Sequence, residues 1–555
     1  MARTIRLRPW QKEALERFRT KVEGARLDDA VDFLAVATPG AGKTTFALTA
    51  ARHWLAERPD ALLVVVAPTQ HLKTQWASNA AAFELALEPA WRAGEPLPAD
   101  MDGIVTTYQQ VASNPAALAP LAQRGFVILD EVHHAGDDRA WGDGLRTAFT
   151  PAAARLSLSG TPFRSDTNPI PFVSYEWEEA VPDYEYGYGD ALGDGGVVRP
   201  VHFPRIKGHM EWVGADGQFH SHDFDDELDR ARANQRLRTA LSAEGQWMAS
   251  VLEDAHRRLL EVRRTQPDAG GLVICIDVEH ARAIAGLIER RWRVRPTVAT
   301  SDDPMASARI ARFARGDDPW IVAVRMVSEG VDIPRLRVGV FATNTTTELF
   351  FRQALGRLVR WTRGLRTQRA WMYIPDDPRL RRLAEGIAEQ RRHSLFKRRR
   401  PDDEDGFDDP EAGAALDEVG DDEQLSLFQA MSAVATGVEG ADDPDGDDGD
   451  DADSPEELVW DDDVDESLEI SLPPLNRRRV NGVVVAGGAS LAEAKSKLRK
   501  DNADLVAHLV AVTGRSHREV NGELNRLAGV RKVTEATADQ LQRRLVAGER
   551  WAKTL

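Results

Sequence analysis

The sequence predicts an α/β protein with two tandem parallel-sheet domains, an acidic disordered linker and a small all-α C-terminal module. Three observations support this fold class. Short apolar runs alternate with helical patterns in two separate stretches of the chain, which is typical of parallel sheets covered by helices. An Asp-rich segment without Lys or Arg follows the second stretch. The last residues then return to a helical period.

Ten apolar runs, five in each stretch, are the predicted strands. The first five are residues 31–37, 61–67, 103–106, 126–129 and 155–159, and the second five are residues 271–277, 297–299, 320–325, 338–343 and 370–375. A helical pattern covers residues 225–264, and a basic helix is expected over 379–393.

Five regions follow from this pattern. Residues 1–200 and 270–396 are the two sheet domains, and residues 201–269 are a connector that contains helices. Residues 397–485 are expected to form a linker that is first basic and then acidic, and residues 486–555 a helical module. Because its acidic part has few apolar residues to bury, the linker is predicted to be disordered.

The charge of the chain is distributed unevenly. The net charge is −18, but residues 401–470 hold 29 Asp and Glu and no Lys or Arg, which leaves +11 for the remainder. A basic folded part suits a polyanionic partner such as nucleic acid. The acidic segment is either a solvated tether or a mimic of nucleic acid, and this linker or the C-terminal module is a candidate site for a protein partner.

The sequence argues against a protein built on disulfides or a cysteine zinc cluster, and against a secreted or membrane protein. The single cysteine, Cys275, excludes a disulfide framework and a cysteine zinc cluster, and its apolar surroundings predict a buried strand position. We see no signal peptide and no apolar stretch of about 18 residues, so we expect a cytoplasmic protein without a membrane partner.

A glycine-rich segment, Thr38-Pro-Gly-Ala-Gly-Lys-Thr-Thr45, follows the first predicted strand and precedes a helix expected to begin near Lys43. In that context the backbone N–H groups and the helix N-terminus favour phosphate, Lys43 bridges the outer phosphates, and Thr44 ligates Mg²⁺. The alternative is a chance glycine-rich turn. The predicted nucleotide-binding residues of this loop are Pro39, Gly40, Ala41, Gly42, Lys43, Thr44 and Thr45.

The predicted strand at 126–129 ends in Asp130-Glu-Val-His133. Two adjacent carboxylates at a strand end suit two tasks: Asp130 holds Mg²⁺, and Glu131 orients and deprotonates the attacking water. No other ligand stands at metal spacing from His133, so a relay between nucleotide and nucleic acid is the better interpretation of this histidine.

Over most of residues 5–375 these motifs resemble superfamily 2 DExH-type helicases and translocases, in the branch of restriction-enzyme translocase subunits and DNA-repair helicases. The segments that carry the resemblance further are Leu7-Arg-Pro-Trp-Gln11, Ala67-Pro-Thr69 with Leu72 and Gln75-Trp76, Thr106-Thr-Tyr-Gln109, Ser159-Gly-Thr-Pro162, Ser328-Glu-Gly-Val-Asp-Ile-Pro334 and Gln353-Ala-Leu-Gly-Arg-Leu-Val-Arg360. Gly160 stands where alanine is common in the family. The resemblance implies RecA-like sheet domains with ATP and Mg²⁺ as cofactors.

The resemblance also implies roles for individual residues. Arg8 and Gln11 would contact adenine, and Gly330 and Asp332 would lie near the nucleotide. The implied nucleic-acid contacts are Pro68, Thr69, Thr106 and Thr107, and the implied coupling residues are His133, Ser159, Thr161 and Gln353.

On a continuous helix Gln353, Gly356, Arg357 and Arg360 would share one face. Arg357 and Arg360 are therefore expected to stabilise charge on the transferred phosphoryl group, as arginine fingers do. Together with Lys43 and Glu131 they form the predicted catalytic set.

The function expected from the resemblance is an ATP-dependent DNA helicase or translocase that hydrolyses ATP in a cleft between its two domains. DNA is favoured because the Asp-Glu-Ala-Asp and His-Arg-x-Gly-Arg motifs of RNA-directed DEAD-box proteins are absent. The alternatives are an RNA helicase, or an ATP-gated nucleic-acid-binding or defence protein that does not unwind.

The C-terminal module fits two interpretations equally, a helix-turn-helix-like DNA-binding element and a docking bundle. Glu493-Ala-Lys495 in this module is expected to be helix surface rather than part of a nuclease site, because a second metal-binding carboxylate is missing.

Overall fold

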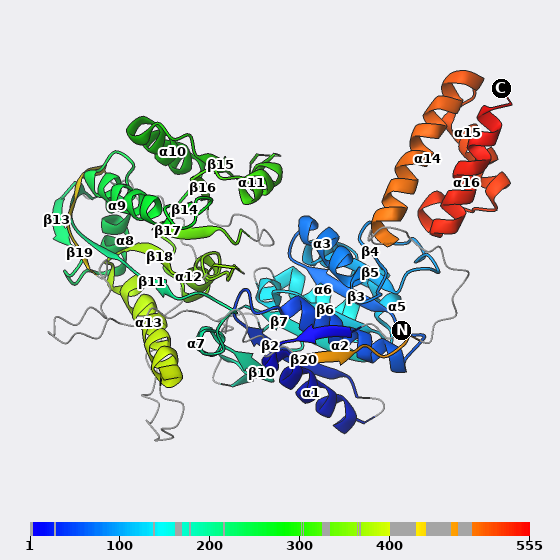
Figure 1. Ribbon diagram of the computed structural model, residues 1–555, viewed down its shortest axis with the longest axis horizontal. Coiled ribbons are helices and arrows are strands. Elements are labelled where there is room, and N and C mark those ends of the chain that lie inside the picture. Colours follow the sequence, from blue (N-terminus) through cyan, green and yellow to red (C-terminus); the bar gives the residue numbers. More distant parts are fainter. Residues whose placement is uncertain are drawn as a thin grey trace. The chain divides into compact units, whose positions relative to one another are not determined.

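The computed structural model describes residues 4–26, 29–136, 139–160, 169–176, 179–214, 217–300, 302–303, 305–324, 333–362, 364–365, 368–399, 429–439, 468–475 and 491–554. The chain divides into two compact units (Figure 1). The first comprises Met1–Val36, Gly42–Glu185 and Glu466–Leu555, and the second comprises Ala37–Ala41 and Tyr186–Asp465.

The first unit contains a seven-stranded sheet with the order β10-β2-β7-β6-β3-β5-β4. Neighbours from β2 to β4 run parallel. The strands are β2 Val31–Ala37, β3 Leu63–Ala67, β4 Leu87–Glu88, β5 Gly103–Thr107, β6 Phe126–Leu129, β7 Ala154–Ser159 and β10 Tyr184–Tyr186. Every residue of β3, β5, β6 and β7 is buried, as expected for strands covered on both faces.

Helices cover this sheet on both faces. They are α1 Pro9–Gly24, α2 Lys43–Glu57, α3 Gln70–Ala81, α4 Tyr108–Ser113, α5 Pro115–Ala122 and α6 Arg139–Phe149. On one face, Phe18 of α1 and Trp54 of α2 pack against Phe126 with ring centroids 5.7 Å apart in each case. On the other face, Val127 and Leu129 share a core with Val111, Leu118 and other residues of α4 to α6.

The second unit contains a nine-stranded sheet with the order β13-β12-β18-β17-β14-β16-β15, to which β11 adds beside β18 and β19 beside β12. The strands are β11 Val201–His202, β12 Arg205–Val213, β13 Phe219–Asp223, β14 Gly270–Cys275, β15 Thr297–Ala299, β16 Trp320–Val324, β17 Leu336–Ala342, β18 Ala370–Pro375 and β19 Gln429–Glu439. The helices are α7 Tyr188–Gly193, α8 Arg230–Ala240, α9 Gln246–Val262, α10 Val278–Trp292, α11 Ala306–Arg315, α12 Glu348–Leu355 and α13 Pro378–Arg399. The central strands are parallel, whereas β13 and β19 pair with β12 in antiparallel orientation.

The predicted fold class is confirmed, since each of the ten predicted strands is present with its ends shifted by at most two residues. Cys275 lies fully buried in β14, as predicted, and burial raises the pKa of its thiol. Among the described residues no helix combines the length and apolar character that crossing a bilayer requires.

The region predicted as a connector belongs to the second unit. Helices α8 and α9 confirm the helical pattern over residues 225–264, but β11, β12 and β13 were not predicted. Buried and partly exposed residues alternate along β12, as in a half-buried strand that pairs with neighbours distant in sequence. The first predicted domain also ends too late, because the chain enters the second unit at Tyr186 rather than at residue 201.

The prediction of disorder across residues 397–485 is wrong for two segments. Strand β19 pairs with the whole of β12, and β20, Leu468–Ser471, pairs with β1, Thr4–Leu7. Residues 429–438 contain no acid, so the average composition of the region concealed a segment able to join a sheet edge. The acidic stretches at 400–428 and 440–467 lie outside the described residues.

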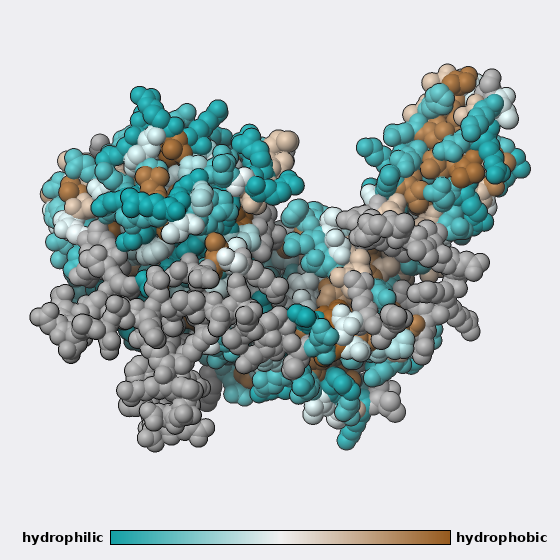
Figure 2. Space-filling view, in the orientation of Figure 1, coloured by the Kyte–Doolittle hydropathy of each residue, from teal (hydrophilic) through white to brown (hydrophobic). Residues whose placement is uncertain are grey.

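Three helices form the C-terminal module: α14 Leu491–Thr513, α15 His517–Ala528 and α16 Ala538–Ala552. Its apolar core includes Val506, Leu509, Val520 and Leu524. Figure 2 shows apolar side chains between hydrophilic ones on the visible side of this module.

A buried guanidinium joins the three helices of the module. Arg544 on α16, 1% exposed, donates hydrogen bonds to the side-chain oxygens of Asn502, Asn521 and Asn525 at 2.8, 2.6 and 2.8 Å. Burial lowers the pKa of Arg544. The side-chain oxygens of these three asparagines therefore share one hydrogen-bond donor, the Arg544 guanidinium.

We expect Arg544→Met to destabilise the module by about 2–4 kcal/mol, because the buried Asn502 and the partly buried Asn521 and Asn525 lose their donor. Hydrogen–deuterium exchange of the amides of α14 to α16 measures this local opening. Arg543→Met is the matched control, since Arg543 is exposed and pairs with Asp539 on the surface, and such pairs contribute little. Equal loss of protection in both variants would contradict the role of the buried network.

Candidate nucleotide and nucleic-acid site

The glycine-rich loop has the geometry predicted from its sequence. Strand β2 ends at Ala37 and helix α2 begins at Lys43. Gly40 and Gly42 have φ angles of 90° and 96°, in the left-handed region that favours glycine. At Gly42 a Cβ atom would also stand 2.6 Å from Nε2 of Gln11, so a larger residue there would displace this side chain in addition to straining the backbone.

Gln11, predicted to contact adenine, braces the phosphate loop. Its side-chain Nε2 donates to the carbonyl oxygen of Gly42 at 2.9 Å, and its Oε1 accepts from the backbone N–H of Arg8 at 2.8 Å. Gln11 is only 3% exposed. Any contact of this amide with adenine would therefore have to coexist with these bonds or replace them.

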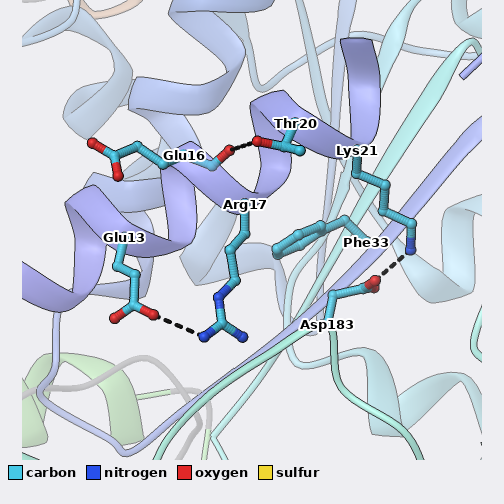
Figure 3. A pocket seen from close by; sticks show the side chains of 7 residues that line it. All are labelled: Glu13, Glu16, Arg17, Thr20, Lys21, Phe33 and Asp183. Atoms are coloured by element: carbon cyan, nitrogen blue, oxygen red, sulfur yellow. Dashed lines mark hydrogen bonds and ion pairs between the residues drawn. The ribbon is translucent and has the colours of Figure 1, made fainter. Parts of the chain in front are cut away.

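A shallow cavity of about 400 Å³ lies beside α1 (Figure 3). Its walls carry both charge signs, and Arg17 pairs with Glu13 while Lys21 pairs with Asp183. Three carboxylates and two cations line it, so it has no excess of positive charge for a phosphate. The predicted site residues lie elsewhere.

Lys43 and Glu131 meet at the end of the loop. Lys43 Nζ lies 3.0 Å from Glu131 Oε1, and the backbone N–H of Gly160 donates to Glu131 Oε2 at 3.0 Å. Burial alone would raise the pKa of the Glu131 carboxyl, but Lys43, His133 and the hydrogen bonds outweigh it and lower the pKa to about 2. Glu131 has a φ of 47°, a left-handed conformation that costs about 1–2 kcal/mol for a non-glycine residue.

Asp130 is held by two aromatic residues to which the sequence analysis gave no role. Nε1 of Trp76 on α3 donates to Asp130 Oδ2 at 2.8 Å, and Oη of Tyr108 on α4 donates to the Asp130 carbonyl at 2.9 Å. Trp76 is 2% exposed and Tyr108 is fully buried. Both residues lie within motifs that resemble nucleic-acid-binding segments of the family. Their place in these motifs was the sequence feature that could have indicated a role.

Two predicted coupling residues, His133 and Ser159, are brought together. His133 Nδ1 and Ser159 Oγ are 3.1 Å apart, and both residues are buried. The same ring nitrogen lies 3.7 Å from Glu131 Oε2. A third predicted coupling residue, Thr161, lies outside the described residues.

Among the predicted nucleic-acid contacts, Thr69 differs from Thr106 and Thr107. Pro68 and Thr69 are partly exposed at the start of α3, where the buried Thr69 hydroxyl has no hydrogen-bond partner among the described residues. By contrast, Thr106 and Thr107 are each 2% exposed and bond to Gln110. Side-chain contact with a nucleic acid through Thr106 or Thr107 would therefore require rearrangement.

The second unit corrects the predicted helical face. Helix α12 contains Gln353 but ends at Leu355, and Gly356 follows as its C-terminal cap. Arg357 and Arg360 therefore lie beyond the helix, because the chain turns there and its Val359 carbonyl accepts the Arg199 N–H at 2.9 Å.

Arg360 contacts the glycine-rich loop, whose residues Ala37–Ala41 group with the second unit. A Cβ atom on Gly40 would stand 3.2 Å from Arg360 Nη1, and one on Gly356 would stand 2.7 Å from Pro39 Cγ. The predicted residues Gly330 and Asp332 lie outside the described residues.

These residues fit a magnesium nucleotide. The N-terminus of α2 has no side-chain cap and no acidic residue in its first turn, so its N–H groups are suited to an anion. Lys43 supplies a cation at the same point, and Thr44 and Asp130 supply the oxygen ligands that Mg²⁺ prefers.

Residues 4–164, which include this loop and the Asp130–Glu131 pair, match the family model described as "Type III restriction enzyme, res subunit". This match supports the predicted resemblance of the chain to superfamily 2 helicases and translocases. This class comprises nucleic-acid-dependent ATPases and translocases in general.

The chain belongs to the family that includes two mycobacterial proteins. "Uncharacterized protein MT2985" of Mycobacterium tuberculosis is 40% identical over 98% of this chain and 92% of its own length. "Uncharacterized protein ML1624" of Mycobacterium leprae is 37% identical over 98% of this chain and 93% of its own length. Among solved structures, the ATP-dependent type ISP restriction-modification enzyme LlaBIII bound to DNA is 15% identical, with a TM-score of 0.43, over 70% of this chain and 30% of that chain.

We expect Trp76→Phe to lower ATP turnover about ten- to a hundredfold and to raise the Mg²⁺ concentration needed for half-maximal activity. The substitution keeps an aromatic ring but removes the indole N–H that donates to Asp130, a hydrogen bond to a carboxylate. Mg²⁺ titrations of ATPase activity at saturating ATP measure both effects.

Trp54→Phe is the matched control. Trp54 is buried in the same unit, and its indole N–H has no hydrogen-bond partner among the described residues. If both variants shift the Mg²⁺ titration equally, the effect reflects general packing and Trp76 does not position Asp130.

Proposed function

We propose that this protein is an ATP-dependent DNA translocase or helicase in which Lys43, Thr44, Asp130 and Glu131 form the hydrolytic site. The observation that carries this proposal is the contact between Glu131 and Lys43, 3.0 Å apart, at the N-terminus of α2. A carboxylate and an ammonium group at this position suit proton acceptance and phosphate binding respectively.

Magnesium-bound ATP would supply the phosphoanhydride bond whose cleavage releases the free energy for movement. The loop N–H groups and Lys43 bind the phosphates, while Thr44 and Asp130 hold Mg²⁺. Glu131 orients water and accepts its proton. Arg357 and Arg360 stabilise negative charge on the transferred group, and the position of Arg360 beside Gly40 supports this role.

The ion pair also affects the basicity of Glu131. With Lys43 beside it, Glu131 has a pKa of about 2 and is a weak proton acceptor. Burial acts in the opposite direction, so the pKa of Glu131 depends on the Lys43 ammonium.

One helix supports coupling between nucleic acid and nucleotide. Helix α3 begins after Thr69 and carries Trp76, the donor to Asp130, two turns later. Lys73 on the same helix donates to Gln110 on α4 at 2.9 Å, which ties the two predicted nucleic-acid-binding segments together. A strand held at the start of α3 would therefore favour one position of Asp130.

DNA is proposed as the track because the chain outside residues 401–470 is basic and lacks the two RNA-directed motifs. Contacts to phosphates would dominate, so we expect little sequence preference and steep salt dependence.

We expect Glu131→Gln to lower ATP turnover by about 10²–10⁴-fold while retaining ATP binding, because the amide cannot accept the proton. ATPase rates with single-stranded DNA, duplex DNA and RNA, each beside a nucleotide-binding assay, measure the effect. Glu95→Gln is a control, since Glu95 is an acid of the same unit outside the site. Unchanged turnover in Glu131→Gln refutes the assignment of the base, and stimulation by RNA alone refutes DNA. A forked-duplex assay separates unwinding from translocation.

A further inference from the structure

The C-terminal module is fixed to the first unit by buried charges. Lys495, predicted to be helix surface, is fully buried, and its Nζ lies 2.9 Å from Asp100 Oδ1. Arg499 forms two contacts with Glu88, at 2.9 and 3.3 Å. The backbone N–H of Ala538 also donates to Asp100, at 2.9 Å. Two helices of the module are thus anchored at one point, so the module has a defined orientation on this unit.

Within the described residues, the opposite end of the module carries cations without an ion-pair partner. There the turn at residues 514–516 joins α14 to α15, and α16 ends close by (Figure 1). The Arg515 guanidinium lies 5.7 Å from the ring centroid of Trp551, which places the turn against the end of α16. We define the distal patch as the exposed residues Arg515, Arg518, Arg550 and Lys553 around the partly exposed Trp551.

The distal patch differs from the other charged surface of the module. Within the described residues, none of its four cations has a carboxylate within ion-pair distance. The nearby Glu519 accepts hydrogen bonds from the backbone N–H and the hydroxyl of Ser516, and Arg515 acts on Glu519 and Glu523 only through its charge, which helps to lower the pKa of both carboxyls. Elsewhere on the module the surface cations Arg526, Lys532 and Arg543 pair with Glu523, Glu535 and Asp539.

We propose that the distal patch is a second DNA-binding surface, which holds the phosphate backbone of the DNA on which the motor acts. Clustered like charges repel one another unless a partner neutralises them, and exposed Arg and Lys beside an indole suit phosphates and bases. The anchor at Asp100 and Glu88 keeps this surface fixed relative to α3, the helix that begins after Thr69. The proposal rests on the proposed function, since it assumes a DNA track.

The test compares two triple variants of the full chain that change the net charge equally. The first is Arg515→Gln, Arg518→Gln and Arg550→Gln, and the control is Arg526→Gln, Lys532→Gln and Arg543→Gln. Fluorescence anisotropy measures affinity for duplex and single-stranded oligonucleotides across salt concentrations. For three lost phosphate contacts, the slope of log K against log [salt] should become shallower by about 2.7 on duplex or about 2.1 on a single strand.

The control should change the slope by less than half as much, and replacing the first three arginines by lysine should keep it. The form of DNA that shows the larger change identifies the form bound by the patch. Equal changes in the two glutamine triples would overturn the proposal, even if their circular dichroism shows intact folding. A parent protein with no measurable DNA affinity would instead refute the proposed function.

Discussion

The ion pair between Lys43 and Glu131 is the interaction on which the rest of the site depends. A buried carboxylate is unfavourable unless a cation or hydrogen bonds compensate it, and here Lys43 and the Gly160 N–H do so. The ammonium reaches this position only because α2 begins at Lys43, directly after two left-handed glycines. The ion pair and the Gly160 hydrogen bond therefore link three places: the glycine-rich loop, the end of β6 and the start of the loop after β7.

The sequence predicted the central strands because their signal is local. β6 consists of apolar residues, and β2 does so apart from Asp32; such runs are buried wherever they occur, so the ends of both strands were predicted to the residue. By contrast, β19 and β20 exist because distant strands offer free edges to them. Neither the composition nor the periodicity of a segment shows whether a distant strand has an unpaired edge. The acidic residues around β19 and β20 therefore favoured a prediction of disorder.

The same distinction applies within the candidate site. Lys43, Asp130 and Glu131 were predicted because phosphate and metal chemistry demands those residue types in that order. The hydrogen bonds of Trp76 to Asp130 and of Gln11 to Gly42 join residues 54 and 31 positions apart. No local sequence pattern predicts such bonds. The helix expected to carry Arg357 and Arg360 ends before both residues. The spacing of residues in the sequence does not show the turn at Gly356.

The pairing of β19 with β12 affects where this protein can be truncated. A fragment that stops near residue 400 would contain every motif of the motor, yet it would lack the strand that satisfies the backbone of Arg205–Val213. The exposed amides and carbonyls would then be available to another chain, the usual origin of edge-to-edge aggregation. Part of the acid-rich region therefore covers the edge of β12, and a fragment that keeps β12 paired must extend beyond the last motif.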